Sequence, residues 1–267
     1  LYSDYYKKNK EKTIEPWKQF IQAYPQDNKK LPDGYLLNLE RILTKNQKER
    51  LLFGNWEYDD DPSIMIDYEA ICDVFTNDFA EKGAGFISAD LAMKGRDKFI
   101  ASVWNGFECT IAIDKPYSVG KEIENDLKNL MTINNIPSSR LVADSDGMGS
   151  YLESYLNNIK EFHGGAKAID PLYFNLKSEC AYKLAELVNN RKIKINCTKE
   201  QQEAIKDELG VLKTLNIDND ETKKRINSKD EMKALIGRSP DYLDSLIMRM
   251  YFEVDPIKKR TYNRILS

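Results

Sequence analysis

The chain has 267 residues, a length that fits one large domain or one domain with an appendage. Its net charge of −3, with 41% hydrophobic and 31% charged residues, is typical of a soluble globular protein. No apolar run approaches the roughly 18 residues of a membrane helix, and the polar, basic N-terminus is unlike a signal peptide. The chain has a single histidine, His163, in a predicted loop, and its four cysteines lack CxxC spacing, which argues against a histidine-based triad and a structural zinc site.

Residues 1–80 are predicted to form a segmented helical region. The segment WKQFIQAY (17–24) has apolar residues at helical spacing. After the turn-rich connector QDNKKLPDGY, leucines at 36, 37, 39, 43, 51 and 52 predict two short helices that end at Gly54. This region therefore differs in pattern from the rest of the chain.

After Gly83 the pattern becomes that of an α/β domain. Two apolar runs joined at Asn105-Gly106 predict a β-hairpin. Further strands are predicted at GFISAD (85–90), RLVAD (140–144), GGAKAID (164–170) and KIKIN (192–196). Helices are predicted at SVGKEIENDLKNLMTINN, SYLESYLNN, KSECAYKLAELVNNR and from Thr198 to Leu215. This order predicts a mixed sheet with an antiparallel start, flanked by helices.

The last predicted helix, in GRSPDYLDSLIMRMY, contains two aspartates with different explanations. Ser239 is the predicted N-cap, and Asp241 suits the first turn, where the helix dipole favours negative charge. Asp244 lies off the polar arc formed by Asp241, Ser245 and Arg249, on a helix that is otherwise largely apolar. A buried carboxylate there must pair with a lysine or arginine, or bind a metal ion.

Asp244 is one of three aspartates that together indicate metal chemistry. Two predicted strands end in aspartate, at Asp90 and Asp144. In open α/β sheets, ligands gather at the carboxyl ends of the strands, so neighbouring parallel strands would bring Asp90 and Asp144 into one crevice. Three carboxylates without a histidine are typical of a site for Mg²⁺, and two such ions support phosphodiester hydrolysis.

The same segments carry a resemblance to a known family. The chain resembles ribonuclease H-like nucleases, and more closely the nuclease (C-terminal) domain of the terminase large subunit of tailed bacteriophages. The matching segments are DLAMKGRDKF (90–99), ADSDGMGSYL (143–152) and KDEMKALIGRSPDYLDSL (229–246). Upstream, DNKKLPDGYLLNLERI (27–42) and KERLLFGNW (48–56) resemble the segment that joins the terminase motor to its nuclease.

The resemblance implies a domain organisation. Residues 1–80 would be the helical linker or tail of the preceding motor domain, and residues 81–267 the ribonuclease H-like nuclease domain. No GxxxxGK[ST] motif occurs, so the ATPase motor is absent from this chain, which is expected to begin just after it. Ser245 stands where the family commonly has alanine.

The resemblance also implies site residues. Asp90, Asp144 and Asp244 would bind Mg²⁺ or Mn²⁺, with Asp90 bridging two ions. Asp241 and Asp146 would make outer or water-mediated contacts, with the structural alternative that the Asp146-Gly147 pair forms the tight turn before the next helix. The basic residues near these acids are candidates for contacts with DNA phosphates, with plain surface solvation as the alternative: Lys94, Arg96, Lys229, Lys233 and Arg238.

The function implied is metal-dependent endonuclease cutting of concatemeric double-stranded viral DNA during genome packaging. The implied partners are double-stranded DNA, the terminase ATPase domain in cis, the portal protein and the small terminase subunit, without a membrane. The implied location is the cytoplasm of the bacterial host, with transient docking at the procapsid portal. The alternatives are another ribonuclease H-like nuclease of the resolvase or transposase type, or a non-catalytic DNA-docking module.

Overall fold

A computed structural model describes residues 5–6, 8–32, 34–43, 48, 52–54, 61, 63–91, 98–116, 120–144, 156–215 and 223–254. The chain divides into two compact units, Leu1–Pro62 and Ser63–Ser267. Among the described residues, no helix has the length and apolar character needed to cross a membrane.

The first unit contains short helices at α1 (Lys8–Lys10), η2 (Pro25–Asp27) and α2 (Tyr35–Ile42). The helix α2 confirms one of the two helices predicted from the leucine pattern, and most of the second lies outside the described residues. The helix suggested by the spacing in 17–24 is wrong, because that segment has no helical structure. Trp17 and Ile21 are 78% and 75% exposed, so these two apolar side chains gain little burial that would stabilise a short helix.

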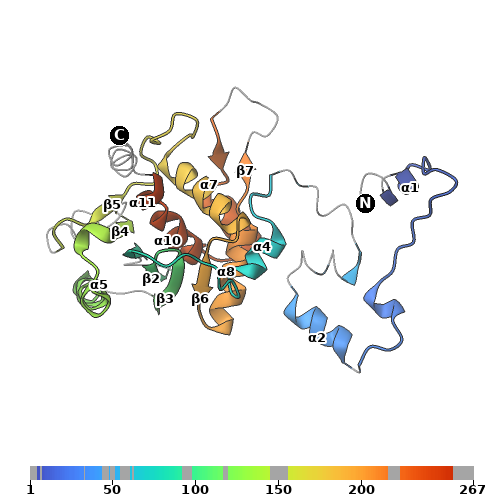
Figure 1. Cartoon of the computed structure of the whole chain (residues 1–267), viewed down its shortest axis with the longest axis horizontal. Coiled ribbons are helices and arrows are strands. Elements are labelled where there is room, and N and C mark those ends of the chain that lie inside the picture. The colour runs from blue at the N-terminus through green and yellow to red at the C-terminus, as the bar shows by residue number, and fades with distance from the viewer. Residues whose placement is uncertain are drawn as a thin grey trace. The chain divides into compact units, whose positions relative to one another are not determined.

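The second unit is built on a six-stranded mixed sheet (Figure 1). Its strands are β1 (Gly85–Asp90), β2 (Phe99–Asn105), β3 (Glu108–Lys115), β4 (Leu141–Asp144), β5 (Lys160–Phe162) and β6 (Lys194–Asn196). The spatial order is β5-β4-β1-β2-β3-β6. The first three strands pair antiparallel, whereas β4 is parallel to β1 and β5, and β6 is parallel to β3. The predicted mixed sheet with an antiparallel start is confirmed.

The predicted hairpin is confirmed, but one predicted strand is displaced. Strands β2 and β3 are joined at Gly106, whose φ of +63° suits glycine in the turn. The strand expected at 164–170 is wrong, since β5 lies just before it at Lys160–Phe162. The backbone of Gly164 and Ala166 instead accepts hydrogen bonds from the first residues of the following helix, at 3.1 and 2.9 Å.

Helices cover both faces of the sheet. They are α4 (Tyr68–Asp73), α5 (Gly120–Asn134), α7 (Leu176–Asn189), α8 (Lys199–Gly210), α9 (Lys229–Ile236), α10 (Asp241–Arg249) and α11 (Tyr251–Val254), with a short η5 at Ser138–Arg140. One core lies between the sheet and α5, and a larger core lies between the sheet and α4, α7, α8, α10 and α11. In Figure 1, α5 lies apart from α7, α8 and α10, with the strands between them.

Two boundaries differ from the sequence prediction. The helix predicted to run to Leu215 ends at Gly210, and Thr214–Leu215 forms strand β7, which pairs antiparallel with β8 (Arg225–Ile226). Residues 63–80, grouped with the linker by sequence, lie in the second unit. Ile66, Ala70 and Ile71 are buried in the larger core because α4 packs on α7 and α8.

Helix α10, which carries Asp241 and Asp244, is buried along its whole length. All of its nine residues are buried, so the polar arc predicted for Asp241, Ser245 and Arg249 does not face solvent. The N-cap is Pro240 rather than Ser239, and the Pro240 carbonyl accepts the Asp244 N–H at 3.0 Å. The polar side chains of α10 therefore make internal contacts, which define the site.

Candidate active site

Strand geometry puts Asp90 and Asp144 on the same face of the sheet. Strands β1 and β4 are parallel neighbours with Ala89 paired to Ala143, and this register, continued by one residue, sets Asp90 beside Asp144. Side chains alternate between faces along a strand. Ala89 and Ala143 belong to the core on the α5 side, so both aspartates face the α10 side. The neighbouring parallel strands that the sequence analysis required are therefore present.

Helix α10 brings Asp244 to this face. It contacts β1, β2 and β4, and a buried serine cluster attaches it to the sheet. Ser245 Oγ lies 2.9 Å from Ser102 Oγ and donates to the Ser88 carbonyl at 3.2 Å. Trp104 Nε1 donates to Ser88 Oγ at 3.0 Å, which completes the cluster. A small polar residue next to Asp244 thus positions the helix on the two central strands.

A second attachment, which sequence reasoning missed, comes from Glu208 on α8. Its carboxylate accepts the Leu243 N–H at 2.8 Å and pairs with Arg238, whose other terminal nitrogen donates to the Ala204 carbonyl. Glu208 is fully buried, and burial raises its pKa to about 8 although Arg238 and the Leu243 amide favour the carboxylate. The only local signal for Glu208 is a charged residue on the apolar side of an amphipathic helix.

Asp90 is the most electrostatically strained acid of the group. It is 6% exposed, and its Oδ2 is buried without a hydrogen-bond partner among the described residues. Burial is the main reason that the pKa of Asp90 lies well above its usual value, and the Asp244 carboxylate raises it further. Lys229 opposes this shift, whereas Asp241 and Asp144 add to it. The positive charge of Lys229 therefore does not fully compensate the burial of Asp90 and the neighbouring acids.

Asp244 is held by two lysines. Lys177 Nζ lies 2.6 Å from Oδ1, and Lys229 Nζ lies 3.0 Å from Oδ2. Burial acts to raise the pKa of Asp244, but the two lysines outweigh it and hold this pKa below its usual value. Burial likewise acts to lower the pKa of Lys229, yet Asp244 and Asp90 raise it above its usual value. The alternative of ion pairing at Asp244 is therefore realised in this structure.

Asp241 has a positioning contact of its own. Its Oδ2 accepts the backbone N–H of Lys98 at 2.9 Å, and Lys229 Nζ lies 3.8 Å from its Oδ1. Next to it, the hydroxyl of Tyr242 donates to Asp114, which also accepts Lys98 Nζ at 2.8 Å. These contacts tie the first turn of α10 to the start of β2 and to the end of β3.

The remaining predicted residues divide into three groups. Lys94, Arg96 and Asp146 lie outside the described residues. Lys229 contacts the acids, and Lys233 lies one turn further along α9. Arg238 is engaged with Glu208, as described above.

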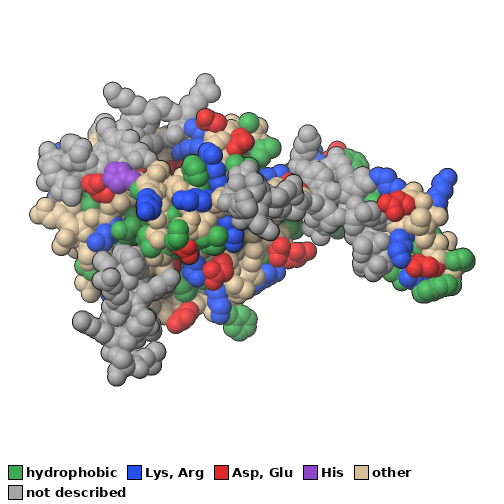
Figure 2. All heavy atoms as spheres, turned by 90° about the horizontal axis from the view of Figure 1, so that it is seen from above, with side chains coloured by type: hydrophobic (Ala, Val, Ile, Leu, Met, Phe, Trp, Pro, Cys, Tyr) green, Lys and Arg blue, Asp and Glu red, His purple; other side chains and the backbone are tan. Residues whose placement is uncertain are grey.

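The single histidine, His163, is exposed, and its Nε2 lies 3.3 Å from a carboxylate oxygen of Glu161. Figure 2 shows the histidine side chain in purple, on a face that also carries Lys and Arg side chains.

The acids fit a divalent cation by their chemistry. Within the described part of the chain, no group of three or more His, Cys, Asp or Glu side chains is already arranged as a metal site. However, four carboxylates influence one another at the end of β1, against two lysines that contact them. The unpartnered Oδ2 of Asp90 and its raised pKa indicate that additional positive charge would be bound favourably there.

No protein-family model and no curated protein sequence matches the chain. Among solved structures, it is similar to the nuclease domain of the large terminase subunit gp2 of bacterial virus Sf6, with 17% identity and a TM-score of 0.55 over 70% of this chain and 97% of that one. A lysine-to-alanine variant of that domain with manganese and beta-thujaplicinol has 18% identity and a TM-score of 0.59 over 70% and 97%. The same variant with calcium has 16% identity and a TM-score of 0.57, over 70% of this chain and 98% of that one.

These similarities confirm the predicted fold. The six-stranded mixed sheet flanked by helices is consistent with the ribonuclease H-like fold of these terminase nuclease domains. At these identities the similarity establishes the fold alone.

Proposed function

We propose that the chain, which has the fold of terminase nuclease domains, is a metal-dependent endonuclease that cuts concatemeric double-stranded viral DNA during genome packaging. The observation that carries this proposal is the clustering of Asp90, Asp144 and Asp244 on one side of the sheet, with Oδ2 of Asp90 buried and unpartnered among the described residues. The lysine-to-alanine variant of the similar Sf6 domain was solved with manganese and with calcium, which supports a divalent ion as the cofactor here.

The chain's own groups would act as ligands and as positioning residues. Asp90, Asp144 and Asp244 would hold Mg²⁺ or Mn²⁺, and Asp241 would orient the first turn of α10 through its bond with the Lys98 amide. Ions held by these carboxylates would supply the chemistry of phosphodiester hydrolysis, namely activation of a water and stabilisation of the leaving oxygen. Lys177 and Lys229, which pair with Asp244 here, would compensate part of the negative charge of the acids and of the DNA phosphate.

The wider context is part of the same proposal. Residues 1–80 would connect this domain to a terminase ATPase domain in cis, and the portal protein and small terminase subunit would be partners during packaging. The protein would work in the host cytoplasm and dock transiently at the procapsid portal. Of the predicted DNA-phosphate contacts that the structure describes, Lys229 and Lys233 on α9 are the candidates, because Arg238 is engaged with Glu208.

Supercoiled plasmid tests the proposal directly. Incubation with the chain and Mn²⁺ should yield nicked and linear DNA, and EDTA should prevent this. Binding of plasmid without any cleavage in Mn²⁺ or Mg²⁺ would overturn the proposal and favour a non-catalytic DNA-docking module, in which the lysine pairing of Asp244 would be the permanent state. Cleavage that continues in EDTA would exclude the metal-dependent mechanism.

A further inference from the structure

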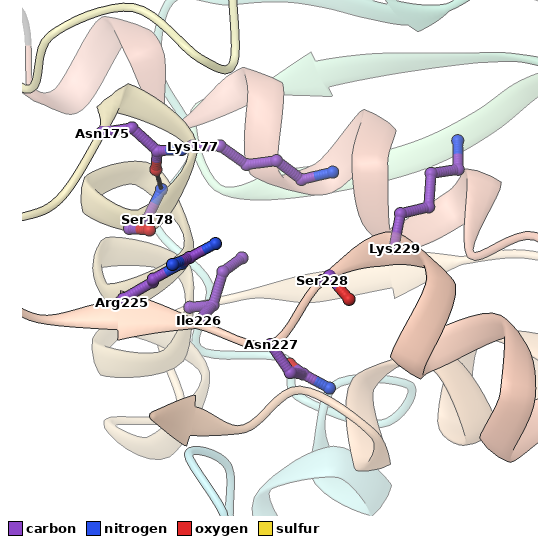
Figure 3. Close-up of a pocket in the computed structure, with 8 residues that line it drawn as sticks. All are labelled: Asn175, Lys177, Ser178, Arg225, Ile226, Asn227, Ser228 and Lys229. Atoms are coloured by element: carbon purple, nitrogen blue, oxygen red, sulfur yellow. Dashed lines mark hydrogen bonds between the residues drawn. The ribbon is translucent and has the colours of Figure 1, made fainter. Parts of the chain in front are cut away.

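A small pocket adjoins the acids between α7 and the segment that runs from β8 into α9. It has a volume of about 110 Å³ and is lined by Asn175, Lys177, Ser178, Arg225, Ile226, Asn227, Ser228 and Lys229. Figure 3 shows Asn175, Lys177 and Ser178 at the upper left, and the residues from Arg225 to Lys229 running below them and to the right. This volume is well below the roughly 300–1,000 Å³ of sites for drug-sized ligands, so the pocket suits a small group.

The lining has one sign of charge. Three of the eight lining residues are basic and none is acidic, so the pocket favours an anion. Lys177 and Lys229 extend from this lining to Asp244, at 2.6 and 3.0 Å. An anion in the pocket would therefore lie next to the two lysines that border the proposed catalytic acids.

Several lining side chains are already used by the fold. Asn175 Oδ1 accepts the Ser178 N–H at 2.9 Å as the cap of α7, a contact drawn in Figure 3. Asn227 bonds to the Lys213 amide and the Val211 carbonyl, at 2.9 Å each. Ser228 forms the capping box of α9. These groups shape the pocket and hold its two walls in place.

Two polar groups of the lining have no such use. Ser178 is 1% exposed, and its Oγ is buried without a hydrogen-bond partner among the described residues. Arg225 stacks on the ring of Phe174, 4.4 Å from its centroid, and its charge also acts on the Glu231 carboxylate, although it forms no salt bridge in the described part of the chain. A buried hydroxyl without a partner costs stability, and an arginine that is oriented by stacking retains its guanidinium donors for an acceptor.

We propose that this pocket binds a backbone phosphate of the DNA strand next to the scissile phosphate, with Arg225 supplying the charge and Ser178 a hydroxyl donor. This inference rests on the proposed function, because it assigns the group to the nuclease substrate. The pocket would fix the register of the strand relative to Asp90 and Asp244 without reading its sequence, since phosphate contacts position DNA whereas base contacts specify it.

The test measures the affinity of the full chain for a short DNA duplex in EDTA over a series of KCl concentrations. Arg225→Gln should weaken binding roughly tenfold and reduce the slope of log affinity against log salt by about 0.9, the value for one lost phosphate contact. Ser178→Ala should weaken binding roughly threefold with an unchanged slope, because it removes a donor without a charge. Thermal unfolding of each variant confirms that it is folded.

Arg140→Gln is the matched control. Arg140 is also exposed and stacked on a phenylalanine, Phe86, but it precedes β4 and so lies at the opposite end of that strand from Asp144. Its substitution should leave affinity and slope as in the wild type. An Arg225→Gln variant with the wild-type slope, or an equal loss of slope in Arg140→Gln, would overturn the assignment.

Inorganic phosphate separates the two sources of the anion. If phosphate raises the melting temperature of the wild type but not of Arg225→Gln, while the DNA slope is the same in both, the pocket binds free phosphate and the DNA assignment is wrong. The outcome is independent of cleavage. Absence of plasmid nicking by the wild type would overturn the nuclease proposal, whereas normal nicking with an unchanged Arg225→Gln slope would overturn the pocket alone.

Discussion

Lys177 Nζ lies 2.6 Å from Oδ1 of Asp244, so a salt bridge joins the first turns of α7 and α10. The bridge lies where the proposed metal site would be, and Lys229 contacts the other oxygen of the same carboxylate at 3.0 Å. In the absence of divalent ions, these two lysines supply the positive charge that a buried Asp244 requires. The stability of the metal-free protein is therefore linked to the same atoms as the proposed activity.

Lys177→Met is expected to destabilise the metal-free protein. Removing one partner of a buried ion pair costs roughly 3–5 kcal/mol, and because Lys229 still compensates Asp244 we expect about 2 kcal/mol. Urea denaturation in EDTA measures this loss. Lys183→Met, on the same helix in a surface pair with Glu186, is the control and should change stability little. Equal losses in both variants would show that the Asp244 contact is not special.

Asp90→Asn is expected to stabilise the metal-free protein while removing its activity. The raised pKa of Asp90 means that its ionised form is disfavoured by burial, so a neutral amide of the same shape should raise the free energy of unfolding by roughly 0.5–2 kcal/mol at neutral pH. Plasmid nicking in Mn²⁺ should be lost. Asp126→Asn, which removes a half-buried acid paired with Lys115 far from the site, should alter neither the stability nor the nicking activity. A less stable, active Asp90→Asn variant would contradict both assignments.

Asp244→Asn should also abolish nicking, but with the opposite effect on stability. Lys177 and Lys229 hold the pKa of Asp244 below its usual value, so its ionised form stabilises the fold. The neutral amide leaves two partly buried ammonium groups without their carboxylate, and the melting temperature in EDTA should fall. Thermal unfolding of Asp244→Asn beside Asp90→Asn measures the contrast. Retained cleavage in both variants would refute the site.

Glu208 predicts a pH dependence of stability. Its pKa is raised from 4.5 to about 8 in the folded protein, so between these values the folded state holds a proton that the unfolded state releases. The free energy of unfolding should therefore fall as the pH rises from 4.5 to 8, and level off above. Glu208→Gln removes the titrating group and with it this pH dependence. Denaturation curves at several pH values between 4.5 and 8 should therefore show that the wild type loses stability relative to the variant as the pH rises. Glu203→Gln, exposed on the same helix, should follow the wild type.

Ser245 tests how closely α10 must approach the sheet. Ser245→Leu would insert a larger side chain between Ser88 and Ser102, and overpacking of this kind costs roughly 1–3 kcal/mol. Because Asp244 is the preceding residue, nicking should fall together with stability. Ser245→Ala removes only the hydroxyl contacts and should retain nicking with a smaller loss in melting temperature. Normal activity of Ser245→Leu would show that the serine cluster does not position Asp244.

Local pattern accounted for much of the fold. The strands at 85–90 and 141–144, the hairpin at Gly106 and the helices α5 and α7 follow from apolar periodicity and turn residues, which act over a few neighbours. The hairpin β7–β8 was missed for a different reason. Thr214 donates its N–H to the Ser63 carbonyl at 2.8 Å, and contacts so distant in sequence override the helical pattern that continues past Gly210.

For the site, the amino-acid sequence by itself determined that Asp90 and Asp144 end two apolar strands and that Asp244 occupies a helix position without a local reason. Strand periodicity and helix geometry are enough for this. Only the tertiary structure decided that the two strands are parallel neighbours, in a register that puts both aspartates on the same face of the sheet. It also decided that Lys177 and Glu208, which are far from α10 in sequence, contact this helix. Such pairings depend on how separate elements pack, and no spacing along one segment encodes them.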